Sequence, residues 1–341
     1  MNKALIFIVF FVVLIGGLFI YMNRFQKPVE VSQEVLNKLN ESRPTLSQDE
    51  EKFLSLLEQN AVSGGPPKDG IPSIDNPKYT TAKEADSWLK LNDIVFGVDY
   101  QGFVAAYPQR ILVWHEILNE TINGEKVAVT YCPLTGTAIG FKTKLAQDLS
   151  STFGVSGKLV NSNLIMYDRI SDSYWSQILG RSIKGFAKGK RLEEFPIIWT
   201  TWERWKKEHP DTRVLSEDIG FVRNYDVNGD PYGSYIREDK GYYASERLIF
   251  EPIVKDDRLQ PKTVVVGIRD NQGNAIAILK DSLRQQKKME VPLGDKIVLV
   301  DYDERLDFYH ASVKDTGEWI NAFDAMWFAW VAFYPDTKLI Q

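Results

Sequence analysis

A chain of 341 residues can form two domains or one enlarged domain, and its charged (26%) and hydrophobic (44%) fractions are ordinary for a globular protein. The net charge of −5 leaves no basic footprint, which argues against nucleic acid as a partner. The single cysteine, Cys132, excludes both an intrachain disulfide framework and a zinc site made of four thiolates.

The first residues predict a membrane anchor. Ala4 to Met22 is an uncharged, mostly apolar run between Lys3 and the basic residues Arg24 and Lys27. As a helix it would extend roughly 28 Å, about the thickness of the hydrocarbon core of a bilayer. Because no small-residue cleavage site follows, we expect an uncleaved single-pass anchor over 1–27, with the soluble body extracytoplasmic.

Residues 28–67 are expected to form a stalk with one short helix. Ser47 and Glu50 have the spacing of a capping box, and apolar residues follow them with helical periodicity. Gly64 to Pro67 then ends regular structure. Another short helix is predicted to start at Thr81.

An internal repeat organises the rest of the chain. Ile94–Tyr107 aligns with Val264–Ile278, with one inserted residue, and Gly124–Val129 aligns with Gly294–Leu299. A repeat at this spacing predicts one architectural unit used twice. The predicted fold class is therefore α+β, mostly β, with two related hairpin-rich units.

The first unit is expected over 68–213 and the second over 257–341, packed on the first and joined to it by an irregular crossover, 214–256. Apolar runs between turn residues predict the strands. These are 94–99, 103–107, 126–131, 138–143, 151–155, 164–168, 263–268, 275–279 and 296–302. Helices are predicted over 201–208 and 281–288, and 325–334 is too short to span a bilayer and is predicted to be buried.

Two residues of the first unit have no counterpart of the same chemistry in the second. In the alignment, Cys132 lies opposite Tyr302 and His115 lies opposite Gln285. Cys132 precedes Pro133 at a strand-to-loop junction, a common place for functional sites. The thiol is equally compatible with a buried structural role, and a lone histidine in an apolar segment is commonly a core residue.

Cys132 and His115 could form a soft-metal site, with Met166 as a possible third ligand, and copper is the metal that suits such ligands. Alternatively, Cys132 is a nucleophile, His115 its base, and Thr135 a donor to an oxyanion. In the first reading the chain has a metal-binding or redox-associated site, and in the second it is an enzyme.

Seven blocks in order resemble one family. They are Asp69–Pro72, Ala106–Pro108, Trp114–Glu116, Tyr131–Thr137, Phe153–Gly157, Asn163–Arg169 and Tyr174–Gln177. Together they are similar to the prokaryotic family called domain of unknown function 3179, over the stretch from Asp69 to Thr337. The resemblance brings no established activity, and it implies an exported or membrane-anchored protein.

Many members of that family have Cys-Pro-Leu-Cys where this chain has Cys132-Pro133-Leu134-Thr135. A dithiol mechanism within one chain is therefore excluded, and any thiol chemistry depends on Cys132 alone. Three hypotheses remain open. The chain is a copper or redox-associated protein, a non-catalytic module that binds a ligand or partner around a structural Cys132, or an enzyme with a cysteine nucleophile.

Overall fold

The computed structural model describes residues 31–226, 229–233 and 241–341. The predicted anchor, Ala4–Met22, lies outside the described residues. Within the described ranges, no helix is both long and apolar enough to cross a bilayer.

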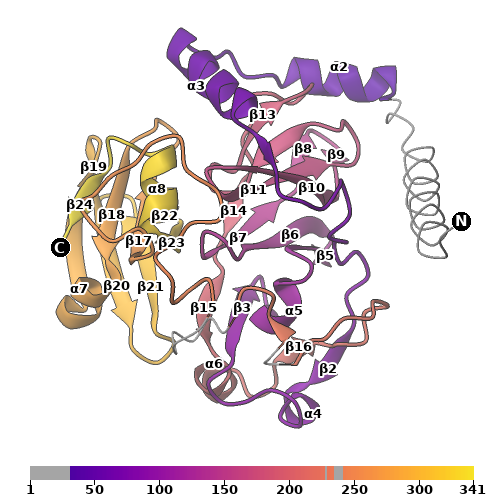
Figure 1. Ribbon diagram of the computed structural model, residues 1–341, viewed down its shortest axis with the longest axis vertical. Coiled ribbons are helices and arrows are strands. Elements are labelled where there is room, and N and C mark those ends of the chain that lie inside the picture. Colours follow the sequence, from indigo (N-terminus) through magenta and orange to yellow (C-terminus); the bar gives the residue numbers. More distant parts are fainter. Residues whose placement is uncertain (1–30, 227–228, 234–240) are drawn as a thin grey trace, which may run out of the picture.

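The described part of the chain is mostly β-strand with short helices, as expected for a mostly β, α+β fold (Figure 1). The helices are α2 (Gln33–Glu41), α3 (Gln48–Gln59), α4 (Ala82–Ala85), α5 (Gln109–Leu112), α6 (Trp202–Glu208), α7 (Lys280–Gln286) and α8 (Trp327–Phe333). The strands of the first half are β1 (Val62–Ser63), β2 (Tyr79–Thr81), β3 (Ile94–Tyr100), β4 (Phe103–Pro108), β5 (Ile117–Ile122), β6 (Glu125–Cys132), β7 (Thr137–Lys142), β8 (Lys144–Ala146), β9 (Leu149–Ser150), β10 (Phe153–Val160), β11 (Asn163–Asp168), β12 (Tyr174–Ser176), β13 (Arg181–Lys184), β14 (Glu194–Phe195), β15 (Ile198–Thr201) and β16 (Arg213–Leu215). Those of the second half are β17 (Val264–Arg269), β18 (Ala275–Leu279), β19 (Lys288–Leu293), β20 (Lys296–Asp303), β21 (Phe308–Val313), β22 (Trp319–Ile320), β23 (Ala322–Met326) and β24 (Lys338–Ile340).

The first unit stacks a helix and two sheets. Its first sheet has the order β15-β3-β4-β16-β2, and its second has the order β14-β7-β6-β5. Alternate residues of β3 face opposite ways, as strand geometry requires. Phe96 packs toward the second sheet, whereas Val95 packs with Trp205 of α6. Gly97 lies directly under Trp205, and a Cβ there would come within 2.2 Å of the indole.

The second unit repeats this arrangement in the order of its strands and in its packing. β23-β17-β18-β24 corresponds to β15-β3-β4-β16, and both orders end in a parallel pair. Gly267 lies under Trp330 of α8 at the same 2.2 Å. The indole Nε1 of Trp205 donates to Thr212, and that of Trp330 donates to Thr337, seven residues later in both cases.

Strand register corrects one detail of the alignment. The hairpin β6–β7 pairs Cys132 with Thr137, and the equivalent hairpin β20–β21 pairs Asp303 with Phe308. The residue that corresponds to Cys132 is therefore Asp303, whereas the sequence alignment places Tyr302 there. The two turns explain the shift, because Asn123-Gly124 corresponds to Gly294-Asp295 and not to the residues one position earlier.

A third sheet, β1-β10-β11-β12-β13, covers the outer face of β5, β6 and β7. Its strands β10 to β13 come from 153–184, between β7 and β15, and β1 comes from the N-terminal segment. The second unit has only β22 between β21 and β23. Figure 1 shows the three sheets of the first unit stacked, with the second unit beside them. This insertion is what places Cys132 in an interior.

The segment 28–67, expected as a stalk, contributes α2 and α3 to the body. Leu39, Leu54 and Leu57 are fully buried in the core beside the third sheet. The capping box predicted for α3 is confirmed, since Ser47 and Glu50 exchange both hydrogen bonds. A short helix at Thr81 is also confirmed as α4, although it ends at Ala85.

The end of the chain and the crossover also follow the sequence patterns. All seven residues of α8 are buried, as predicted for the apolar run 325–334.

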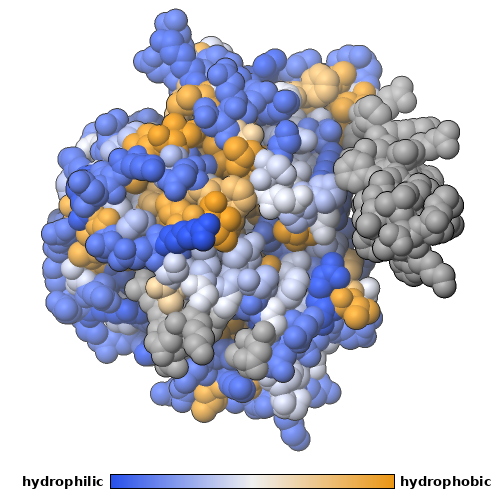
Figure 2. Space-filling view, viewed as in Figure 1, coloured by the Kyte–Doolittle hydropathy of each residue, from blue (hydrophilic) through white to orange (hydrophobic). Residues whose placement is uncertain are grey.

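After β16, the described residues up to β17 form no further helix or strand. Figure 2 shows hydrophobic side chains gathered on one face over α8 and the strands beside it. In the last part of the crossover, Ile249 and Ile253 are exposed apolar side chains.

Candidate functional site

The thiol of Cys132 lies between the second and third sheets of the first unit. Cys132 ends β6, Gly136 takes a positive φ of 61° in the turn that follows, and β7 begins at Thr137. The side chain is 1% exposed, and its Sγ donates to the carbonyl of Ser162 at 3.7 Å. Burial, and then the nearby charge of Glu116, raises the pKa of the thiol to about 11.

A buried polar network holds the Cys132 turn against β11. Asn163 donates through Nδ2 to Thr135 at 3.1 Å and to the Gln177 side-chain oxygen at 2.8 Å. Thr137 donates to the same oxygen at 2.7 Å, and Gln177 Nε2 donates to Thr130 at 3.1 Å. Because the Thr135 hydroxyl is shared with Thr137 and Asn163, it serves this network, and the geometry assigns it no oxyanion role.

His115 lies in a different environment from Cys132. Its Nδ1 is 2.7 Å from the carbonyl oxygen of Pro72, and its Nε2 is 2.6 Å from the hydroxyl of Tyr225. Phe221 packs on the ring at 5.0 Å. Burial lowers the pKa of the imidazole to about 4. His115 is thus a neutral core histidine with both nitrogens occupied, and among the described residues it shares no hydrogen-bond partner with Cys132.

Met166 is fully buried in β11, where it pairs with Val155 and Trp175. Across the described ranges, no three or more His, Cys, Asp or Glu side chains come together in a way that could hold a metal ion. Cys132 and Met166 share the core beside the third sheet, whereas the contacts of His115 belong to the core between the first two sheets. The structure therefore gives the predicted copper set His115, Cys132 and Met166 no support.

The carboxyl group beside Cys132 belongs to Glu116, a residue the sequence analysis did not propose for the site. Glu116 has a positive φ of 58°, which turns the chain from α5 into β5. Its backbone is fixed at both ends, since its N–H donates to Leu112 O and its carbonyl accepts from Tyr131, each at 2.7 Å. Left-handed backbone at a non-glycine residue is costly and often occurs at functional sites.

The environment of this carboxyl group is apolar. Glu116 is 5% exposed, and its carboxyl group has no hydrogen bond or ion pair with any residue that the structure describes. Burial raises its pKa to about 8, so the group is largely protonated at neutral pH. His115 and Glu116 lie in the turn between α5 and β5, where strand alternation does not apply, so no pattern in the sequence indicated which of them lies near Cys132.

Glu116 reaches a cavity of about 240 Å³ at the edge of the third sheet. Most of the cavity wall is apolar. Its lining consists of Gly64, Pro66, Ile71, Glu116, Leu134, Val155, Gly157, Lys158, Leu159, Leu164, Tyr232, Ile249 and Phe250. A cavity of this kind, apolar with one polar group, is the usual form of a small-molecule site.

The crossover forms one wall of the cavity and is tied to the Cys132 turn. The hydroxyl of Tyr242 donates to Leu134 O at 2.8 Å, and that of Ser162 donates to Phe250 O at 2.7 Å. Lys262 Nζ lies 3.4 Å from the centre of the Tyr242 ring and donates to Arg247 O at 2.8 Å. The cavity is thus lined by segments that are distant in sequence: the N-terminal segment, Glu116, the Cys132 turn, β10 and β11, and the crossover.

This geometry offers a hydrogen-bonding carboxyl group to a small molecule, but it does not activate the thiol. A nucleophilic cysteine has a lowered pKa and lies near a cation or a base. Here burial and the neighbouring Glu116 shift the pKa of Cys132 the opposite way.

The model of the family described as "Protein of unknown function (DUF3179)" matches residues 68–316. The chain belongs to this family. A comparison with curated proteins and with solved structures found no match. In this DUF3179 protein, several residues of the family-like blocks hold the third sheet in place: Tyr167 donates to Asp69 at 2.5 Å, and Trp175 Nε1 donates to Asp168 at 2.9 Å.

Proposed function

We propose that this DUF3179 protein is a binding module, anchored to the cell membrane with its body extracytoplasmic, that takes a small neutral molecule into the Glu116 cavity. The molecule would have an apolar body and a hydrogen-bond acceptor, such as a carbonyl oxygen. The observation that carries the proposal is the Glu116 carboxyl group, which reaches an apolar cavity and has no partner among the described residues.

The chemistry of the cavity supports a neutral ligand. An unpaired polar group in an apolar site is costly, and a ligand that satisfies it recovers that cost. Because the pKa of Glu116 is raised to about 8, its carboxylic acid is protonated at neutral pH and can donate a hydrogen bond to an acceptor on the ligand. The surrounding leucine, isoleucine and phenylalanine side chains would contact the apolar body of the ligand.

Burial of Cys132 favours a binding module over an enzyme or a copper protein. A copper centre would need a deprotonated thiolate, and it would need His115 to leave the carbonyl of Pro72 and the hydroxyl of Tyr225. The thiol instead packs at the junction between the hairpin and the third sheet, where its role is structural.

The membrane part of the proposal rests on the sequence of Ala4–Met22 and on the resemblance to exported proteins. Fractionation of cells that express the full-length chain would test it. The protein should sediment with membranes, and an external protease should digest the body in intact cells from which any outer envelope has been removed. A soluble or protected body would contradict this part alone.

The cavity is tested with two probes of one shape, acetophenone and ethylbenzene, since only acetophenone has an acceptor oxygen. Both are of a size that the cavity can hold, since dry cavities of about 150 Å³ bind benzene. Titration calorimetry of the full-length protein at pH 6.5 should show that acetophenone binds about 2- to 10-fold more tightly than ethylbenzene. This is the difference in affinity that one neutral hydrogen bond contributes.

Two variants of Glu116 distinguish the effect of its hydrogen-bond donor from the effect of its side-chain volume. Glu116→Gln keeps an N–H donor and should retain the preference for acetophenone at every pH, whereas Glu116→Leu should abolish it. In the wild type the preference should disappear above about pH 8, as the acid ionises. The proposal would be rejected if neither probe bound, or if Glu116→Leu still preferred acetophenone.

A further inference from the structure

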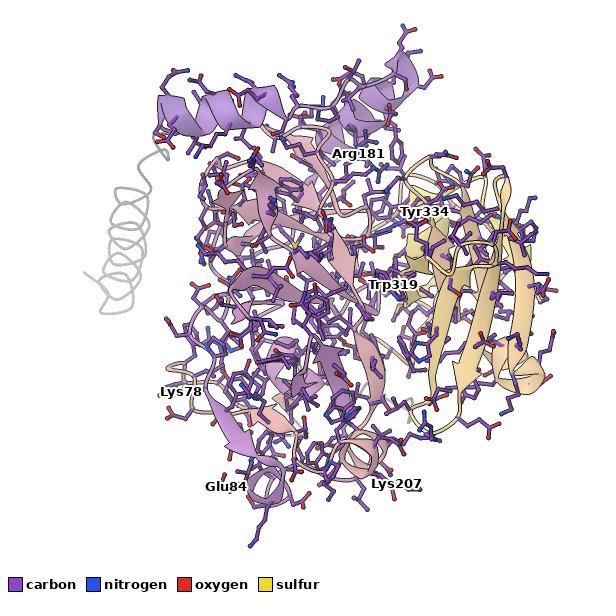
Figure 3. All side chains as sticks on the ribbon, turned by 180° about the vertical axis from the view of Figure 1, so that it is seen from behind. Lys78, Glu84, Arg181, Lys207, Trp319 and Tyr334 are labelled. Atoms are coloured by element: carbon purple, nitrogen blue, oxygen red, sulfur yellow. The ribbon has the colours of Figure 1, made fainter. Side chains whose placement is uncertain are left out.

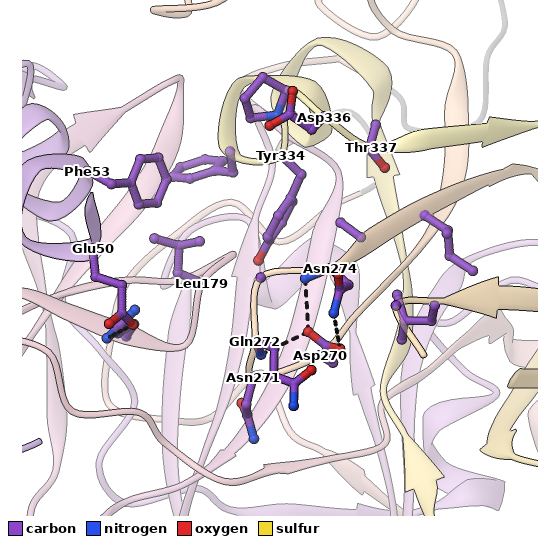
Figure 4. Close-up of a pocket in the computed structure, with 18 of the residues that line it drawn as sticks. Glu50, Phe53, Leu179, Asp270, Asn271, Gln272, Asn274, Tyr334, Asp336 and Thr337 are labelled. Atoms are coloured by element: carbon purple, nitrogen blue, oxygen red, sulfur yellow. Dashed lines mark hydrogen bonds and ion pairs between the residues drawn. The ribbon is translucent and has the colours of Figure 1, made fainter. Parts of the chain in front are cut away.

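A second and larger cavity, of about 860 Å³, lies where the N-terminal helix α3, the third sheet and the second unit meet. Figure 3 shows Arg181 and Tyr334 on the two sides of this junction. Figure 4 shows the ring of Tyr334 reaching into the cavity from the end of α8, with Phe53 and Leu179 opposite and the Asp270–Asn274 turn below.

Two arginines, Arg181 and Arg191, line this cavity, and Arg269 lies near Arg191. Arg181 pairs with Glu50 at 2.7 Å, and Arg269 pairs with Glu194 at 2.5 Å. Arg191 lines the cavity and has no ion pair or hydrogen bond from its side chain to any described residue. Burial, and then the neighbouring Arg181, lowers the pKa of Arg191, which shows how poorly its charge is compensated.

The carboxylate of Asp270, which also lines the cavity, makes its hydrogen bonds within its own turn and not to Arg191. Asp270 accepts from the backbone N–H groups of Gln272 and Asn274, each at 2.9 Å, and from Asn274 Nδ2 at 2.7 Å. Figure 4 shows these bonds as dashed lines within the turn. Arg191 is therefore the lining arginine that no carboxylate of a described residue contacts.

Tyr334 supplies a second polar group, whose hydroxyl interacts electrostatically with Arg269. Its hydroxyl is buried and has no hydrogen bond within the part of the chain that the structure describes. Arg191 and Arg269 are its charged neighbours. A buried hydroxyl and a partly exposed guanidinium that no described carboxylate contacts thus line one cavity, and both can donate to a negatively charged acceptor.

We propose that this cavity binds a small organic monocarboxylate, with its carboxylate on the Arg191 guanidinium and the Tyr334 hydroxyl. One negative charge matches the one lining arginine that no described carboxylate contacts, and the planar guanidinium fork suits the two carboxylate oxygens. Phe53, Leu179 and Phe333 offer apolar surface to the body of the ligand. A phosphate dianion would bring twice the charge of that arginine.

This site is independent of the Glu116 cavity. The two cavities have no lining residue in common. The elements that close the larger one, α3 and the residues after α8, lie outside the range 68–316 that the family model matches. Arg191 and the Asp270–Asn274 turn lie inside that range, so the site combines residues of the family region with segments on either side of it.

The test uses benzoate as the probe, the neutral benzamide as its isostere and phenyl phosphate as the dianion, titrated calorimetrically into the full-length protein. Benzoate should bind most tightly. Arg191→Met should weaken benzoate binding by about 10- to 100-fold and Tyr334→Phe by about 2- to 10-fold, in keeping with charged and neutral hydrogen bonds. Lys207→Met removes a positive charge from an exposed position remote from Tyr334 in Figure 3, and should change nothing.

Thermal unfolding without any ligand gives a second, independent measurement. Since no described carboxylate contacts Arg191 and the Tyr334 hydroxyl has no hydrogen bond among the described residues, Arg191→Met and Tyr334→Phe should unfold at the same temperature as the wild type or at a higher one. The proposal would be overturned if benzoate bound no better than benzamide, or if phenyl phosphate bound more tightly than benzoate. It would also be overturned if both variants kept the wild-type affinity. Because Glu116→Leu should leave benzoate binding unchanged, failure here and failure of the proposed function are distinguishable.

Discussion

The two units share a framework but differ in what covers it. Each has a helix with a tryptophan over a glycine of the first sheet, Trp205 over Gly97 and Trp330 over Gly267. In the first unit the outer face of β6 is buried by an additional sheet. In the second unit the equivalent strand β20 carries the partly exposed residue Asp303, paired with Arg305, where β6 has Cys132.

The difference shows that the repeat builds the scaffold and that the insertion builds the site. Both cavities discussed above use parts of the chain outside the repeated framework: the third sheet and crossover for Glu116, and α3 for Arg191. An aspartate in place of Cys132 suits a surface near water, whereas a covered surface needs an apolar or neutral residue.

The largest expected effect tests the shared framework. Trp205→Ala and Trp330→Ala should each lower the free energy of unfolding by about 3–5 kcal/mol, because each removes a fully buried indole that fills the space over a glycine. Urea denaturation measures both. Trp319→Ala, at a position 39% exposed, is the matched control and should cost less than about 0.5 kcal/mol. A large loss in only one of the two variants would break the equivalence of the units.

A smaller effect concerns the pH dependence of stability, which should differ between His115 and Glu116 on the two sides of the second sheet. The pKa of His115 is about 4 in the folded protein and its ordinary value is 6.5, so the unfolded chain binds a proton first as the pH falls. The stability that neutral His115 contributes is present above pH 6.5 and is lost toward pH 4, about 3 kcal/mol at 1.36 kcal/mol per pKa unit.

His115→Gln should remove this acid-side loss, as measured by urea denaturation at pH 7 and pH 4.5 against the wild type. Glu116 gives the control of opposite sign. Its folded pKa is raised, so its contribution is present below about pH 4.5 and is lost as the pH rises to about 8. Glu116→Gln should therefore alter only the neutral-to-alkaline side. An unchanged acid-side slope in His115→Gln would contradict the buried neutral imidazole.

The smallest expected effect concerns the thiol. Cys132→Ala should destabilise the fold by only about 1 kcal/mol, since it deletes one small buried group and leaves the polar network of Thr135 intact. Iodoacetamide should label the wild-type thiol slowly in the native state, because the pKa of Cys132 is raised to about 11, and rapidly after unfolding. Mass spectrometry measures the extent of labelling over time. Fast labelling of the native protein would show that the third sheet does not protect the face of β6 that carries Cys132.

Local patterns predicted much of this fold correctly. The hairpins at Gln101-Gly102 and Asn123-Gly124 form with positive φ at all four residues, and the capping boxes at Ser47 and Thr81 start helices. Each depends on a few neighbouring residues whose conformations are strongly restricted. Strand β5 was not predicted, because its sequence, Ile117–Ile122, alternates poorly and follows an irregular turn.

The sequence analysis placed the candidate site at Cys132 with His115 beside it, whereas in the structure the carboxyl group near the thiol is that of Glu116. The Trp114-His115-Glu116 block contains both an imidazole and a carboxyl group, and sequence alone cannot tell which of them faces Cys132. The left-handed backbone at Glu116 decides it, together with the Pro72 carbonyl and Tyr225 hydroxyl that hold His115 on the other side.

By itself, the sequence determined the family, the mostly β repeated framework, the helix caps and the apolar N-terminal run, because each depends on periodicity or on residues close together in the chain. Only the tertiary structure decided which face the third sheet covers, which arginine lacks a carboxylate and which acid reaches a cavity. These properties depend on burial and on partners brought together from distant parts of the chain, so no local pattern contains them.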